Sequence, residues 1–182
     1  MPRDHRPAKS IRVLLAEDPG MTRGALALLL GMEADIQVVA QVGAGDAIVD
    51  AALVHRPDVA LLDVELPGTS GLDAAAELRD QVPDCRVLIL ATSGRPGYLR
   101  RAMDAGAAGF LVKDGPVKDL VRAVRRVLTG ETVVDPALTA TAPSTTPSTA
   151  PNPLTDREGA PLNSSADDDT EAMRRARQQG PL

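Results

Sequence analysis

Short apolar runs, each followed by a segment with helical periodicity, recur along residues 11–130 and limit what this chain can fold into. The runs lie at residues 11–16, 36–41, 59–62, 86–91 and 109–112. Apolar runs of this length, bounded by turn-forming residues, are typical of strands buried on both faces. Helical segments are predicted at residues 19–31, 46–55, 71–81, 98–105 and 116–130. Because strands alternate with helices, we predict an α/β fold, a five-stranded parallel sheet with helices on both faces.

The central run ends abruptly in a carboxylate, Asp63. Pro67 and Gly68 then turn the chain, and Ser70 can cap a helix that begins near Gly71. In an open parallel sheet, chemistry gathers at the carboxyl ends of the strands. Asp63 is therefore placed to be a reactive group. On this stretch alone, an ordinary turn-forming aspartate at a strand end is the alternative.

Charged residues follow three of the predicted strands: Glu17 and Asp18 the first, Asp63 the third, and Lys113 the fifth. These ends are expected to converge, because the first and third strands are neighbours near the switch point of such a sheet. A hard divalent cation such as Mg²⁺ would relieve the repulsion among three carboxylates and leave positions open for a phosphate. Lys113 could pair with Asp63 or with a phosphoryl oxygen. The group could form an acyl phosphate on Asp63, and three unrelated surface acids with a surface lysine are the alternative.

Four motifs resemble the receiver domain of two-component response regulators of the NarL/FixJ type. They are residues 13–18 (VLLAED), 57–68 (PDVALLDVELPG), 94–98 (GRPGY) and 105–114 (AGAAGFLVKD). The resemblance covers about residues 11–130 and implies a flavodoxin-like receiver fold. It also implies a sensor histidine kinase as partner, self-phosphorylation with slow autodephosphorylation, and no enzymatic activity on free substrates.

The resemblance assigns a role to each charged residue. Asp63 would accept the phosphoryl group from the histidine of the sensor kinase. Asp18 and Asp63 would bind Mg²⁺ directly, Glu17 would bind it through water, and the backbone carbonyl of Glu65 would complete the protein ligands. Lys113 would contact the phosphoryl group.

The switch of this family is where the sequence departs from the pattern. Phe110 matches the rotating aromatic residue whose position reports activation. The Thr or Ser that senses the phosphoryl group ends the fourth strand, 22 residues before the lysine, and that position is Ala91. Thr92 follows it but is expected to point to the other face of the strand. Either the backbone shifts so that Thr92 or Ser93 reaches the phosphate, or the switch is weakened.

Composition excludes several classes of protein. The net charge of −5 argues against binding of nucleic acid through bulk charge. A single cysteine, Cys85, excludes an internal disulfide and fits a reducing compartment. His5 and His55 lack neighbours at zinc-ligand spacing. Since no apolar stretch is long enough for a signal peptide or a membrane span, we expect a soluble, cytoplasmic protein with no membrane partner.

The two ends of the chain differ from the receiver region. Residues 1–10 are polar and expected to be flexible. Residues 131–153 are rich in Pro, Ser, Thr and Ala, which predicts a linker, and residues 154–182 predict a disordered or weakly helical tail. Residues 152–158 (NPLTDRE) resemble the opening of a LuxR-type helix-turn-helix domain, which needs roughly four helices. The resemblance stops after Glu158, so we interpret residues 154–182 as a truncated remnant of a DNA-binding domain.

Two functions follow from this reading. The first is a phosphorylation-switched response regulator, in a family that regulates transcription, acting through protein partners. A homodimer is expected, and the outer face of the last helix, which carries Lys118, Arg122, Arg125 and Arg126, could form it through charge. An ordinary solvated helix face is the alternative reading of these residues. The second is a transcriptional regulator in which the tail or a partner chain still contacts promoter DNA, although no DNA-binding residue can be named. A Mg²⁺-dependent phosphohydrolase is a third reading, and no motif for a substrate pocket supports it.

Overall fold

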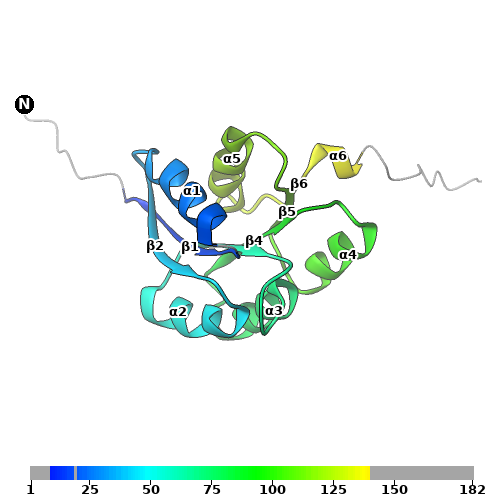
Figure 1. Cartoon of the computed structure of the whole chain (residues 1–182), viewed down its shortest axis with the longest axis horizontal. Helices are drawn as coiled ribbons and strands as arrows, with labels where there is room; N and C mark the ends of the chain where they lie inside the picture. The colour runs from blue at the N-terminus through cyan, green and yellow to red at the C-terminus, as the bar shows by residue number, and fades with distance from the viewer. Residues whose placement is uncertain (1–8, 19, 140–182) are drawn as a thin grey trace, which may run out of the picture. The chain divides into compact units, whose positions relative to one another are not determined.

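The computed structural model describes residues 9–18 and 20–139, all within a unit that spans Met1–Ser144 (Figure 1). Its strands form one parallel sheet in the order β2-β1-β3-β4-β5-β6. The strands are β1 (Ile11–Ala16), β2 (Ile36–Val42), β3 (Val59–Asp63), β4 (Arg86–Ala91), β5 (Gly109–Val112) and β6 (Val133–Val134). The first five have the order of a flavodoxin-like fold, which confirms the predicted architecture and the pairing of β1 with β3.

Helices cover both faces of the sheet. They are α1 (Gly20–Gly31), α2 (Ile48–His55), α3 (Gly71–Gln81), α4 (Pro96–Asp104), α5 (Val117–Val127) and α6 (Pro136–Thr139), with a 3₁₀ turn η1 (Gly45–Ala47) before α2. Figure 1 shows α1 and α5 on one face and α2, α3 and α4 on the other. Within the part of the chain that the structure describes, no helix is long and apolar enough to cross a membrane.

The central strand β3 explains why both faces must be covered. Every residue of β3 is buried. Ala60 and Leu62 pack in the core beneath α2 and α3, whereas Val59 and Leu61 pack in the core beneath α1 and α5. Since successive side chains of a strand point to opposite faces, a continuous apolar run produces this two-sided burial. Only the last residue, Asp63, brings a charge into the buried layer.

The structure differs from the prediction in having a sixth strand. Within the predicted linker, Val133 and Val134 pair with β5, and α6 follows. A two-residue strand is too short to produce a recognisable apolar pattern, so it could not be predicted from the sequence. Residues 140–153 of the predicted linker, the tail at 154–182 and residues 1–8 lie outside the described part of the chain.

Candidate functional site

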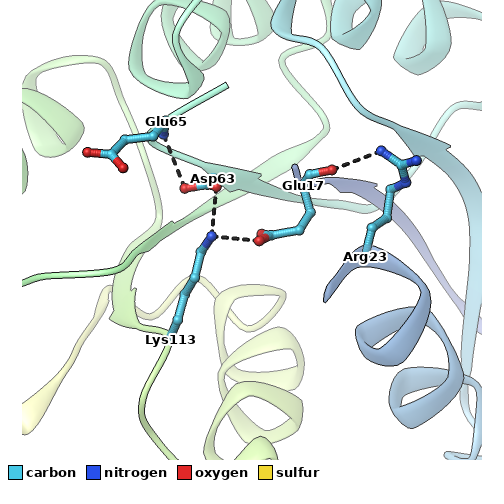
Figure 2. A network of polar contacts seen from close by, with 5 residues as sticks. All are labelled: Glu17, Arg23, Asp63, Glu65 and Lys113. Carbon is cyan, nitrogen blue, oxygen red and sulfur yellow. Dashed lines mark hydrogen bonds and ion pairs between the residues drawn. The ribbon is translucent and has the colours of Figure 1, made fainter. Parts of the chain in front are cut away.

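The carboxyl ends of β1, β3 and β5 bring Glu17, Asp63 and Lys113 into direct contact (Figure 2). The Lys113 ammonium donates to Glu17 Oε1 at 2.6 Å and to Asp63 Oδ2 at 2.7 Å. These partners lie 96 and 50 residues away in the sequence. The sheet therefore brings together three of the four charged residues that the strand-end pattern predicted, with Lys113 held between the two carboxylates and Asp18 outside this contact.

Two buried carboxylates share a single ammonium, which leaves the site with excess negative charge. Glu17 is 1% exposed and Asp63 is 3% exposed, while one ammonium must serve both. Burial raises the pKa of Glu17, the bond to Lys113 opposes that rise, and the nearby charges of Asp63 and Asp18 add to it. Burial alone would lower the pKa of Lys113, but its bonds to Asp63 and Glu17 raise that pKa above the usual value. The second oxygen of Glu17, Oε2, is buried without a hydrogen-bond partner in the described part of the chain.

Backbone groups fix the two carboxylate-bearing segments. The Glu65 N–H donates to Asp63 Oδ1 at 3.1 Å, so each oxygen of Asp63 has a separate donor. The Arg23 guanidinium of α1 donates to the backbone carbonyl of Glu17 at 2.9 Å (Figure 2). Arg23 was not among the predicted site residues, because an arginine in the first turns of a helix more often lies in solvent.

The donor set fits a hard divalent cation. Glu17 and Asp63 present carboxylate oxygens, one of which is buried and unpaired, and Mg²⁺ prefers such oxygen ligands. The Asp18 side chain is exposed at the rim, near enough for its charge to raise the pKa of Glu17. Among the described residues, no three acidic, histidine or cysteine side chains are already gathered as a set of metal ligands. The structure therefore supplies the charge and the oxygen donors, with Asp18 standing apart from the buried pair.

The switch positions lie on or just after the neighbouring strands β4 and β5. Ala91 ends β4, is 1% exposed, and its carbonyl accepts the Lys113 N–H at 2.9 Å. Thr92 is exposed, whereas Phe110 is fully buried in the core beneath α2, α3 and α4. The buried position next to Lys113 thus carries a methyl group, and the first hydroxyl after it lies at the surface.

Acidic side chains and a lysine that meet at one edge of a parallel sheet are typical of one class of protein, the receiver domains. A family model for the response regulator receiver domain matches residues 13–125, and this chain belongs to that family. It is a two-component response regulator receiver, in a family of transcriptional regulators, and is not a classical enzyme.

Two curated relatives and one solved structure show which members of this family the chain is similar to. The chain is 42% identical over 157 residues to the transcriptional regulatory protein DesR of Bacillus subtilis, covering 86% of this chain and 75% of DesR. It is 36% identical over 130 residues to the oxygen regulatory protein NreC of Staphylococcus epidermidis, covering 71% of this chain and 60% of NreC. The receiver domain of NarL from Mycobacterium tuberculosis superposes with a TM-score of 0.66 at 32% identity, covering 68% of this chain and 100% of that domain. The chain spans less than two thirds of NreC.

Proposed function

We propose that Asp63 accepts a phosphoryl group from the phosphohistidine of a sensor kinase. A carboxylate oxygen of Asp63 attacks phosphorus, the new P–O bond forms, and the P–N bond breaks with its electron pair leaving on the histidine nitrogen. The observation that carries this proposal is the pair of bonds from Lys113 to Glu17 and Asp63, at 2.6 and 2.7 Å. The same ammonium can turn to a phosphoryl oxygen when that group arrives.

Mg²⁺ would be held by the carboxylates of Asp18 and Asp63, by Glu17 through water, and by the backbone carbonyl of Glu65. When bound, it supplies positive charge that neutralises the carboxylates and the incoming phosphoryl oxygens. The residues of the chain provide the rest of the arrangement. Glu65 holds one oxygen of Asp63 through its N–H, and Lys113 holds the other.

The output of the receiver is proposed to be a change in protein association, with a second copy of this chain among the candidate partners. The predicted basic face of α5 bears on how a dimer could form. Its arginines are already paired within the chain: Arg122 with Asp119, Arg125 with Glu33 and Asp35, and Arg126 with Glu131. A dimer that uses these arginines must therefore break internal ion pairs.

The test is phosphorylation of the full chain by acetyl phosphate with Mg²⁺, followed by intact-mass spectrometry. We expect one phosphoryl group on the wild type and on Asp50→Asn, whose exposed carboxylate on α2 is the matched control. We expect none on Asp63→Asn. An unlabelled wild type, or labelling that persists in Asp63→Asn, overturns the proposal.

A second candidate function is direct regulation of transcription at promoter DNA. The similarity to DesR covers 157 residues, which is more than the receiver itself, so it continues into the segment after the receiver. Residues 152–158, which resemble the start of a LuxR-type domain, lie outside the described part of the chain. A gel-shift experiment with a salt titration tests this function, because binding through phosphates weakens steeply as salt rises.

A further inference from the structure

Hydrogen bonds to Asp46 hold the loop between β3 and α3, residues 64–70, against the η1 turn. The Oδ1 atom of Asp46 accepts the Thr69 N–H at 2.9 Å and also accepts the Thr69 hydroxyl. Beside it, the Gly45 N–H donates to the carbonyl of Pro67 at 2.9 Å. Three hydrogen bonds thus join the η1 turn to the 64–70 loop.

Two glycines allow the loops to approach this closely. A Cβ at Gly45 would lie 1.6 Å from the carbonyl oxygen of Thr69, so no side chain fits there. A Cβ at Gly68 would lie 2.3 Å from Asp46 Oδ2, and Gly68 has a φ of +76°, which only glycine adopts readily. The close contact between the loops therefore depends on specific residues from both.

The other parts of the same loop are held to Asp63. The Glu65 N–H donates to Asp63 Oδ1 at 3.1 Å, as Figure 2 shows. At the far end, a Cβ on Gly71 would lie 2.0 Å from the backbone oxygen of Asp63, so α3 begins in direct contact with β3. Between these two ends the loop is held by the bonds from Thr69 to Asp46, so we expect their loss to let Glu65 move relative to Asp63.

We propose that Asp46 is a positioning residue for phosphoryl transfer, which acts by holding the 64–70 loop so that Glu65 keeps its place beside Asp63. This inference rests on the proposed function. Asp46 is exposed and lies outside the group of Glu17, Asp63 and Lys113, so it does not touch the reacting atoms. It would fix both the N–H that orients Asp63 and the carbonyl of Glu65 that would face a bound cation.

The test compares Asp46→Ala with Asp46→Asn, and uses Asp50→Ala as the matched control. Asp50 is also an exposed carboxylate, close in sequence, and lies on α2. We expect Asp46→Ala to weaken Mg²⁺ binding, measured by titration calorimetry, about tenfold, which equals about 1.4 kcal/mol. Asp46→Asn should recover most of the affinity, because its amide oxygen still accepts from Thr69. Asp50→Ala should bind Mg²⁺ like the wild type.

Hydrogen exchange at the Glu65 amide provides a readout that needs neither metal nor phosphate. We expect faster exchange in Asp46→Ala, and exchange close to that of the wild type in Asp46→Asn and Asp50→Ala. Unchanged Glu65 exchange in Asp46→Ala overturns the inference, as does unchanged Mg²⁺ affinity. The proposed function fails by a different result, a wild type that acetyl phosphate does not label.

Discussion

Replacing Lys113 with methionine would leave two buried carboxylates without their shared ammonium. Methionine is unbranched and one atom shorter than lysine, so it keeps most of the apolar stem and removes the ammonium with its charge and hydrogen bonds. Glu17 is 1% exposed and Asp63 is 3% exposed, so water cannot take over the role of the ammonium without opening the site. We therefore expect Lys113→Met to lose stability by a mechanism specific to buried charge.

The magnitude follows from the two distances. At an effective dielectric constant of about 20, contacts of 2.6 and 2.7 Å give roughly 6 kcal/mol of attraction each. Desolvation of each ion, which costs several kcal/mol, offsets much of this attraction. Removal of one partner from a buried pair typically costs about 3–5 kcal/mol. For a domain of this size, that loss corresponds to a fall in Tm of roughly 10–20 °C.

The pH dependence has a definite sign. In the variant, Glu17 loses the bond to Lys113 that opposes the effect of burial, so its folded-state pKa rises further above its usual value. The folded state then holds a proton that the unfolded state has released, so stability falls as pH rises through the raised pKa of Glu17. In the wild type, the pKa of Lys113 is raised above 10.5, so its contribution is complete below 10.5 and is lost only as pH rises through the folded value.

Urea unfolding of the wild type, Lys113→Met and Lys118→Met at pH 5 and pH 8 would measure these effects. Lys118 is an exposed lysine of α5 and controls for the loss of one positive charge. We expect Lys118→Met to unfold like the wild type and Lys113→Met to lose more stability at pH 8 than at pH 5. A Lys113→Met variant within about 1 kcal/mol of the wild type at pH 8 would refute the claim that Lys113 compensates buried charge.

Two further predictions concern the switch and the last described helix, α6. Ala91→Thr places a hydroxyl at the buried end of β4. We expect it to enlarge the shift toward dimer that an acyl-phosphate mimic causes, measured by light scattering. A shift equal to that of the wild type would contradict this prediction. Leu138→Ala removes a side chain of α6 that packs against the core, where its Cδ2 would lie 1.9 Å from a Cβ at Gly94. Since Leu138 is only partly buried, we expect the variant's free energy of unfolding in urea to fall by about 1–2 kcal/mol. Leu28, which is 74% exposed, provides a near-neutral control as Leu28→Ala. Equal stabilities of the two variants would show that α6 does not pack against the core.

The core strands were predictable from the sequence because they are buried on both faces and have sharp ends. The bounds of β1, β4 and β5 match the predicted runs, and α3 begins and ends as predicted after its cap at Ser70. Ser70 accepts the Asp73 N–H at 3.2 Å, as a helix cap should. The sixth strand was not predictable, because Val133 and Val134 become a strand only through pairing with β5.

The candidate site was predictable in part. Glu17, Asp63 and Lys113 follow from one rule, that parallel strands end at the same edge of the sheet. The rule cannot say which of two adjacent acids turns inward, and the structure buries Glu17 while leaving Asp18 exposed. The contact of Asp46 with Thr69 gave no signal either, because it depends on how two loops approach each other.

The charges at this site explain why phosphoryl transfer should require a cation. Glu17, Asp18 and Asp63 carry three negative charges against the single positive charge of Lys113, and the buried Oε2 of Glu17 has no donor in the described part of the chain. A phosphoryl group on Asp63 would bring further negative oxygens, which compete for the same ammonium. Lys113 cannot neutralise the carboxylates and the phosphoryl group together, so we expect a divalent cation to take over one of these roles. The fold thus places two buried carboxylates and a single ammonium where a cation and a phosphate are proposed to bind.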